Sequence, residues 1–327
     1  MNNDVANMLN NFPLISIIVP IFNVSDYIDE CLRSVITQTY SNIEILCIDD
    51  CGTDNSMEIV NRYARTDTRI KILKHTVNKG LAPARNLGIV EAKGDFIFFL
   101  DSDDYIHTTT IQELVKNAIT TQADIILCNS KTFLDKKYTT SALNKHINKL
   151  NTLLTADFDT LKVTDENFYS CLSRVPCVAW GKLFKTQFIK KHNLKFINKK
   201  VLHEDNGFQA KFLACKPLIS CVHNELYFYR IRPNSITQNT ISKANKARNL
   251  DLSIQDAISF ILNSKNPSLV SELHDFYYSL FTHRNLCMNF YWGKRSKLLK
   301  ILCIPIINYH SNGENTIKLK IFGIRFV

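Results

Sequence analysis

Three carboxylates follow an apolar run in "GDFIFFLDSDDY", residues 94–105: Asp101, Asp103 and Asp104. Like charges repel, so acids packed this densely at the end of a strand predict a cation facing them. Asp101 and Asp103 are two positions apart, which lets both approach one ion as the chain turns. Carboxylate oxygen suits Mg²⁺ or Mn²⁺, and such ions complete their shells with phosphates. The predicted ligand is a metal-bound diphosphate. The alternative is that these acids cap the next helix or lie in a solvated turn.

Cations lie nearby in "NKGLAPARN", residues 78–86. Lys79 alone is interpreted as a surface charge. Arg85 falls in the first turn of a predicted helix, where the helix dipole disfavours a cation. An anionic partner such as phosphate would explain an arginine in that place.

The elements that must position these residues alternate between strand and helix signals. Helical segments separate apolar strand signals at residues 14–20, 43–49, 69–75, 95–100 and 124–129. This alternation predicts an α/β fold with a mainly parallel sheet and helices on both faces.

Ligands bind such sheets at the C-terminal edges of the strands. The predicted strand ends carry Pro20, Asp49, Asp50 and Asn78, in addition to the three acids that follow the fourth strand. The sequence therefore predicts a row of polar side chains along one edge of the sheet.

Composition narrows the class of protein. The chain has 327 residues, 45% of them hydrophobic, and no apolar run approaches the roughly 18 to 20 residues of a membrane-spanning helix. The N-terminus lacks the features of a signal peptide, so we expect a cytoplasmic protein. None of the ten cysteines forms a CxxC pair, and most lie in apolar segments, as Cys47, Cys128 and Cys303 do; in a reducing compartment they are interpreted as buried small hydrophobic residues. No close Cys/His cluster has the spacing of zinc ligands.

The ordered set "SIIVPIFN", "IEILCIDDCGTDNS" and "NKGLAPARNLGIVEAKGDFIFFLDSDD" closely resembles family 2 glycosyltransferases with the GT-A fold. The match covers about the first 125 residues in order. It continues more loosely through "VAWGKLFKTQFI", "VLHEDNGFQAKFL" and "YFYRIRPNSIT", which look like the acceptor half of bacterial enzymes that build capsule, lipopolysaccharide or other surface glycans.

The resemblance implies a role for each matching residue. Asp101 and Asp103 would hold Mn²⁺ or Mg²⁺, and Asp104 would orient its neighbours. The nucleotide-sugar, expected to be a UDP-sugar, would be held by Pro20, Asp49, Asp50, Asn78, Arg85 and Asp101.

The catalytic base would be a carboxylate of "HEDN", with Asp205 favoured over Glu204. It would take a proton from an acceptor hydroxyl as that oxygen attacks the anomeric carbon opposite the diphosphate, which inverts the centre. Trp180 would stack on a sugar, or else is a core tryptophan. His203 is a weaker candidate for a third metal ligand. Cys51 and Phe22 stand where the family commonly has glycine and tyrosine.

The implied domain organisation is a GT-A domain over residues 1–240 and a helical, basic extension over 241–327. Residues 1–125 form the donor half and 126–240 the acceptor half. Residues 236–327 carry 12 basic and 5 acidic side chains, against 28 and 25 before them. This excess predicts docking of a segment such as 291–308 on the inner face of the cell membrane, beside a lipid-linked or glycan acceptor. The alternative is a solvated helical face; nucleic acid is not expected, since no binding motif accompanies the charge.

The predicted enzyme transfers a hexose or N-acetylhexosamine. One alternative is a non-catalytic nucleotide- or membrane-binding protein of glycan assembly. A metal-dependent phosphatase is less favoured because its acidic motif normally follows the first strand. A dinucleotide oxidoreductase is disfavoured because no GxGxxG follows that strand.

Overall fold

The computed structural model describes residues 12–135, 144–232, 243–264, 266–282, 320–321 and 324–325. Its strands are β1 (Ile15–Ile21), β2 (Ile43–Asp49), β3 (Ile70–Lys74), β4 (Phe96–Phe99), β5 (Tyr105–Ile106), β6 (Ile125–Leu134), β7 (Thr160–Lys162), β8 (Lys182–Lys185), β9 (Leu218–Ile231), β10 (Lys320–Ile321) and β11 (Ile324–Arg325). Its helices are α2 (Ile28–Ile36), α3 (Ser56–Ala64), α4 (Leu81–Glu91), α5 (Thr110–Thr121), α6 (Asn144–Leu153), α7 (Phe168–Arg174), α8 (Thr186–Lys191), α9 (Glu204–Ala214), α10 (Lys243–Asn263) and α11 (Ser268–Thr282).

A nine-stranded sheet in the order β3-β2-β1-β4-β8-β6-β9-β5, with β7 paired to β9, forms the centre of the fold. The α/β class is confirmed, and β3, β2, β1 and β4 are parallel as the sequence predicts. Parallel pairing holds for this part and for the pair β6–β9. β8 lies antiparallel to both neighbours, β4 and β6, and makes the whole sheet mixed.

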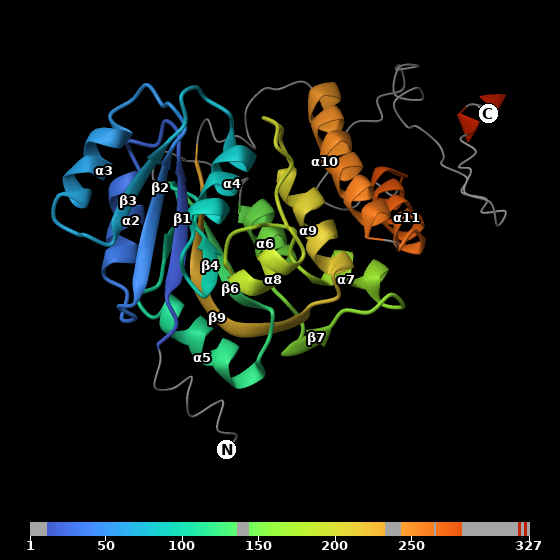
Figure 1. The fold of residues 1–327 in the computed structure, drawn as a ribbon, viewed down its shortest axis with the longest axis horizontal. Helices are drawn as coiled ribbons and strands as arrows, with labels where there is room; N and C mark the ends of the chain where they lie inside the picture. Colours follow the sequence, from blue (N-terminus) through green and yellow to red (C-terminus); the bar gives the residue numbers. More distant parts are fainter. Residues whose placement is uncertain are drawn as a thin grey trace. The chain divides into compact units, whose positions relative to one another are not determined.

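Helices cover both faces of the parallel part (Figure 1). On one face, Ile17 and Val19 of β1 belong to the buried core that includes α2 residues such as Leu32. On the other face α4 packs so closely that a Cβ atom on Gly88 would lie 2.4 Å from Ile18 Cγ2. Successive side chains of β1 thus point to opposite faces of the sheet. The helix α4, which carries Arg85, packs directly on the face that Ile18 occupies.

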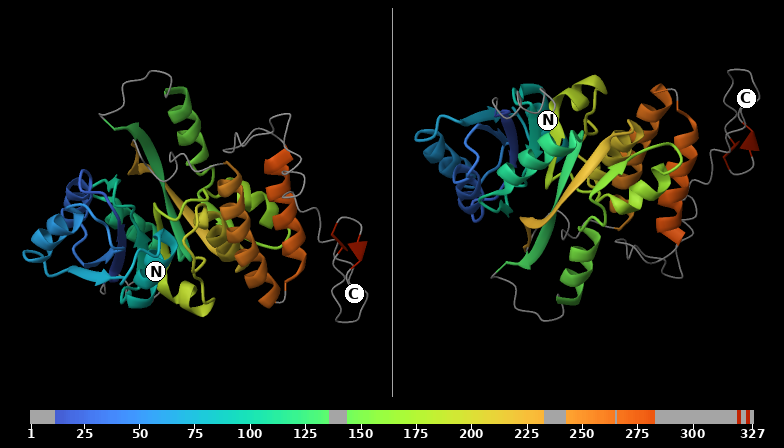
Figure 2. Two further views of the ribbon diagram at one scale, coloured as in Figure 1. Left: turned by 90° about the horizontal axis from the view of Figure 1, so that it is seen from above. Right: turned by 90° about the horizontal axis from the view of Figure 1, so that it is seen from below.

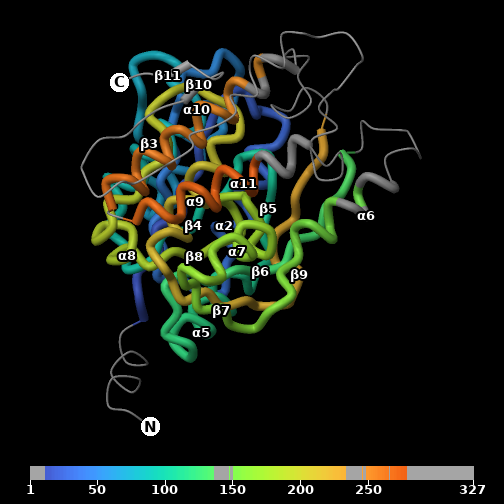
Figure 3. Tube along the Cα trace, turned by 90° about the vertical axis from the view of Figure 1, so that its right-hand side faces the viewer, coloured from blue at the N-terminus to red at the C-terminus, as the bar shows by residue number. Residues whose placement is uncertain are grey.

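The strands β6 and β9 are long and run parallel to each other, as Figure 2 shows. Their far ends lie beside α6 (Figure 3), where the Thr132 N–H donates to Asn151 Oδ1 at 2.8 Å. The short strand β5 comes after the loop that follows β4, and it pairs with β9 at Tyr105–Phe228. The end of β9 therefore lies next to that loop. Residues 131–165 are polar and weakly patterned, which predicts a long excursion or lid; in the structure they include the end of β6, α6 and β7.

The helix α10 packs against α9, and one compact unit runs from Met1 to Ser279. A Cβ atom on Gly207 of α9 would lie 2.3 Å from Ser253 O of α10, so only glycine permits this approach. The predicted boundary at residue 240 stays a prediction, but α10 packs with the residues before that boundary.

The predicted basic segment 291–308 lies outside the described residues. The C-terminal sequence "TIKLKIFGIRFV", residues 316–327, predicts a short strand pair, and β10 and β11 form one that is antiparallel. In the described part of the chain, no helix is both long and apolar enough to cross a bilayer.

Candidate active site

The acids Asp49 and Asp50 lie side by side at the end of β2 but have different partners. The Asp50 carboxylate is buried and accepts the N–H groups of Lys79 and Gly80, each at 2.8 Å, in addition to contacting His75 Nδ1 at 2.7 Å. Asp50 therefore holds the loop that leads into α4. Its two oxygens are used within the protein.

Asp49 has a less enclosed partner. Asp49 Oδ2 lies 3.1 Å from Lys74 Nζ, whose side chain is 68% exposed, and Asp49 Oδ1 accepts the Cys51 N–H at 2.9 Å. Cys51 has a φ of 60°, the left-handed conformation that glycine adopts most readily, at the position where the family commonly has glycine. Of the pair, Asp49 is the acid better placed to meet a ligand at the sheet edge. Pro20 lies beside them, buried in β1 opposite Ile48.

Asn78 joins the donor half to the segment before α9. Its Nδ2 donates to Asp50 O at 3.1 Å, and its Oδ1 accepts a hydrogen bond from Lys200 Nζ. The Lys200 ammonium also lies over the Phe22 ring, 5.9 Å from the centroid. Phe22, which is 42% exposed, and Lys200 thus border the edge where a nucleotide is predicted.

Arg85 lies at the centre of the acidic residues. The helix α4 begins at Leu81, so Arg85 is its fifth residue and lies just beyond the first turn, in which the sequence predicts it. It is 1% exposed, and its two Nη atoms donate to Asp101 Oδ1 at 2.7 Å, Asp205 Oδ1 at 2.7 Å and Glu204 Oε1 at 3.0 Å. The anionic partners of Arg85 in this structure are therefore three carboxylates; the role of Arg85 in holding a nucleotide stays a prediction.

Two carboxylates at the start of α9 share this arginine. Burial raises the pKa of Glu204 to about 8, with the neighbouring Asp205 charge adding to the effect and Arg85 opposing it. Burial also raises the pKa of Asp205, and Arg85 opposes that shift. The Asp205 side chain is 18% exposed and that of Glu204 8%. Asp205 is thus the more accessible of the two.

Asp103 and Asp104 face the end of β9. Asp103 Oδ2 accepts a hydrogen bond from Arg232 Nε at 2.6 Å. Asp104 is buried and accepts from the Tyr227 hydroxyl and from the Arg230 N–H, both at 2.7 Å. Burial raises the pKa of Asp104 well above its usual range, and the charges of Asp103 and Asp101 add to the shift. This geometry is what a residue that orients its neighbours requires.

Each of the two predicted metal ligands, Asp101 and Asp103, accepts a hydrogen bond from an arginine with one carboxylate oxygen. Their side chains remain 21% exposed for Asp101 and 22% for Asp103. Hard, partly exposed carboxylates two positions apart fit a divalent cation that takes its other ligands from phosphate. No three His, Cys, Asp or Glu side chains converge on a metal position within the described ranges, and His203 is placed with φ 63° just before α9.

Trp180 is 5% exposed and stacks on two tyrosines, Tyr227 at 4.2 Å and Tyr229 at 5.2 Å between ring centroids. The residue before it, Ala179, donates its N–H to Asp205 Oδ2 at 3.2 Å. Trp180 therefore lies beside the candidate base, with much of its ring used in packing. Stacking on a sugar stays a prediction.

Sequence reasoning missed Arg230, Arg232, Tyr227 and Lys182. A signal existed for the first two, since "YRIR" places two cations at the end of an aromatic strand. Lys182 lies in "AWGKLF", an apolar context that reads as core.

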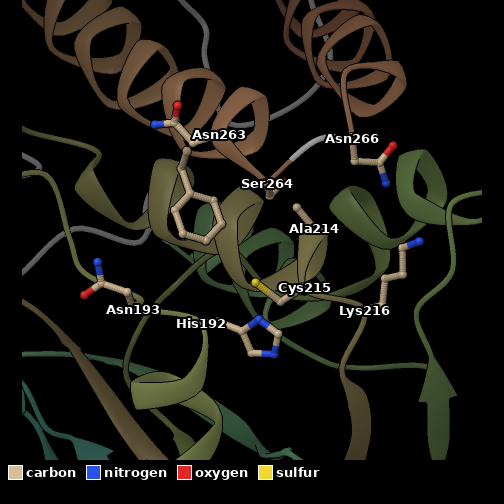
Figure 4. Close-up of a pocket in the computed structure, with 9 residues that line it drawn as sticks. His192, Asn193, Ala214, Cys215, Lys216, Asn263, Ser264 and Asn266 are labelled. Carbon is tan, nitrogen blue, oxygen red and sulfur yellow. The ribbon is translucent and has the colours of Figure 1, made fainter.

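One further pocket, of about 500 Å³, lies elsewhere on the chain (Figure 4). It is lined by His192, Asn193, Ala214, Cys215, Lys216, Phe260, Asn263, Ser264 and Asn266. None of the predicted site residues lines it.

Comparison with known proteins identifies the family of this chain. Residues 16–177 match the family model described as Glycosyl transferase family 2. The chain is 34% identical over 228 residues to the uncharacterized glycosyltransferase EpsJ of Bacillus subtilis, covering 69% of this chain and 63% of EpsJ. It is 30% identical over 308 residues to the putative glycosyltransferase EpsH of the same organism, covering 90% of this chain and 83% of EpsH.

Among solved structures, the fold resembles residues 1–349 of S. aureus TarS in complex with UDP-GlcNAc, with a TM-score of 0.62 and 22% identity. The likeness covers 81% of this chain and 73% of that one. Together with the EpsH match, which spans most of both chains, these findings establish that the chain is a family 2 glycosyltransferase.

Proposed function

We propose that this glycosyltransferase is an inverting, metal-dependent enzyme that moves a sugar from a UDP-sugar to a hydroxyl of a glycan or lipid-linked acceptor in bacterial surface polysaccharide synthesis. The observation that carries the proposal is that Arg85 contacts Asp101, a predicted metal ligand, and Asp205, the predicted base, at 2.7 Å each. Donor and acceptor chemistry would thus meet at one point of the sheet edge.

The donor would lie along the strand ends, with its base near Pro20, Asp49 and Asn78. Asp101 and Asp103 would hold Mn²⁺ or Mg²⁺, which would stabilise the charge on the departing diphosphate. The resemblance to TarS solved with UDP-GlcNAc supports UDP as the carrier. Arg232, beside Asp103, adds positive charge near the predicted diphosphate position.

Asp205 suits the role of base better than Glu204. A group that accepts a proton must be ionised before the reaction, and a pKa of about 8 keeps Glu204 largely protonated at neutral pH. Asp205 is more exposed, and a carboxylate retains lone pairs beyond those used by Arg85 and Ala179. The acceptor oxygen would bond to the anomeric carbon while its proton passes to Asp205. The bond from that carbon to the diphosphate oxygen would break, releasing UDP.

A panel of UDP-sugars, hexoses and N-acetylhexosamines, tests the function with UDP release as the readout, with and without Mn²⁺. The proposal expects metal-dependent release from at least one sugar. Binding of UDP without any turnover would favour the non-catalytic alternative. Hydrolysis of a simple phosphate monoester, with no UDP release, would favour the phosphatase.

A further inference from the structure

Lys182 is a lysine buried in the middle of the sheet. It begins β8, the strand between β4 and β6, and it is 1% exposed. Its ammonium donates to Val178 O. No ion pair found among the described residues includes it. Removing an ammonium from water without pairing it to an anion costs free energy of folding, and packing alone does not repay that cost. A lysine at this position therefore indicates a role other than packing.

The segment of residues 178–182, here the 178–182 arch, connects Lys182 to the candidate base. Lys182 fixes the carbonyl of Val178, and the next residue, Ala179, donates its N–H to Asp205 Oδ2 at 3.2 Å. Gly181, with a φ of 67°, supplies the turn that brings the lysine back under the arch. The position of the Ala179 N–H therefore depends on the hydrogen bond that Lys182 makes one residue earlier.

Lys182 also contributes to the charges around Asp205. Three carboxylates, Asp101, Glu204 and Asp205, contact the single guanidinium of Arg85. Burial lowers the pKa of Lys182 to about 8, while the charges of Cys177, Asp205 and Cys128 oppose the shift and Arg85 adds to it. In the other direction, Lys182 and Arg85 both lower the pKa of Asp205, and Asp101 raises it. Lys182 is thus a second cation near Asp205, contributed by β8 and not by α4.

We propose that Lys182 is a positioning residue for the catalytic base, which holds the 178–182 arch against Asp205 and supplies the second positive charge beside it. The inference rests on the proposed function, in which Asp205 takes the proton of the acceptor. Lys182 itself touches neither substrate nor metal in this scheme.

The test is Lys182→Met, which keeps the length of the side chain and removes its charge and its hydrogen bond. Because the base is then misaligned, kcat should fall by about 10²-fold while the KM for the UDP-sugar stays unchanged. The acidic limb of the kcat–pH profile should move to higher pH, since Asp205 loses a neighbouring cation. A role in packing alone would not move that limb.

Lys185→Met is the matched control, since Lys185 lies on the same strand and is only half-buried. It should leave both kcat and the pH profile unchanged. Lys182→Gln is the second variant, needed if the methionine disrupts folding. A glutamine can still donate to Val178 O, so this variant should retain more of kcat than Lys182→Met and still show the shifted pH limb.

The proposed function and the role of Lys182 are tested by different outcomes. A wild-type protein that releases no UDP from any UDP-sugar overturns the proposed function. A wild-type protein that turns over, with folded Lys182→Met and Lys182→Gln variants that keep its kcat and pH profile, overturns the role of Lys182.

Discussion

Arg85 Nη1 lies 2.7 Å from Asp205 Oδ1, which joins α4 to the first turn of α9. Burial alone would lower the pKa of Arg85, but the charges of Asp205, Asp101 and Glu204 raise it overall, so the guanidinium remains charged. This contact makes the donor half and the candidate base one electrostatic unit.

Replacing Arg85 should therefore be severe. Arg85→Met leaves Asp101, Glu204 and Asp205 without their shared, buried cation, and we expect a loss of about 3–5 kcal/mol in the free energy of unfolding. Urea unfolding of the purified variant measures this loss. Arg65→Met, at an exposed position just after α3, should change the free energy little. Equal stability of the two variants would contradict the importance of the Arg85 contacts.

Glu204 should make stability depend on pH. Its pKa of about 8 in the folded protein lies above that of an unfolded glutamate, about 4.3, so the folded state binds the proton more tightly. Its stabilising contribution is complete below the unfolded pKa and declines as pH rises toward about 8. Urea midpoints measured from about pH 5 to about pH 8 should show this decline in the wild type and a weaker decline in Glu204→Gln.

Glu225→Gln is the control for this pH experiment, because the Glu225 side chain is 54% exposed and pairs only with Lys131 at the surface. Its midpoints should follow those of the wild type at every pH. If Glu204→Gln also follows the wild type, Glu204 is not protonated in the folded protein.

Asp103→Asn should abolish the dependence of UDP binding on Mn²⁺. An amide is a weaker ligand for a hard cation than a carboxylate, and Asp103 is one of only two proposed protein ligands. Calorimetric titration of UDP with and without Mn²⁺ gives the readout. Asp159→Asn, at a side chain 90% exposed and paired with His223, should retain wild-type binding. Mn²⁺-dependent UDP binding of normal affinity in Asp103→Asn would remove Asp103 from the metal site.

Gly207→Ala should show that α10 supports the catalytic helix. The new methyl group would meet Ser253 O, and Ser253 also donates to Glu204 O at 3.3 Å at the start of α9. We expect a loss of about 1–3 kcal/mol in the free energy of unfolding from overpacking, together with reduced turnover. Gln255→Ala, on the exposed face of α10, should do neither. A Gly207→Ala protein as stable and active as the wild type would mean that α10 does not pack tightly on α9.

Much of the donor half could be predicted from the sequence. The strands β1 to β4 are short apolar runs separated by helical periods. This local pattern is clearest in β1 and β2, which are buried at every position, whereas β3 at the edge of the sheet is partly exposed. The polar row at their ends followed from the parallel pairing. Asp104 was expected to orient its neighbours, and its contacts with Tyr227 and Arg230 are of that kind.

The remainder depends on contacts between residues far apart in the chain. Arg85 meets Glu204 and Asp205 across 119 and 120 positions, and Asp103 meets Arg232 across 129. The position of an arginine in the sequence can indicate that it pairs with an anion. It does not identify that anion or show where in the chain the anion lies. The antiparallel placement of β8 between β4 and β6, which buries Lys182, is likewise a property of the assembled sheet.

The central claim is that Asp205 is the base of a metal-dependent sugar transfer. The most direct test compares wild type and Asp205→Asn in Mn²⁺, measuring UDP-sugar affinity by calorimetry and UDP release with water as the acceptor. The account predicts unchanged donor affinity and a rate of UDP release lower by about 10²–10⁴-fold. Unchanged affinity with a wild-type rate of release would contradict it.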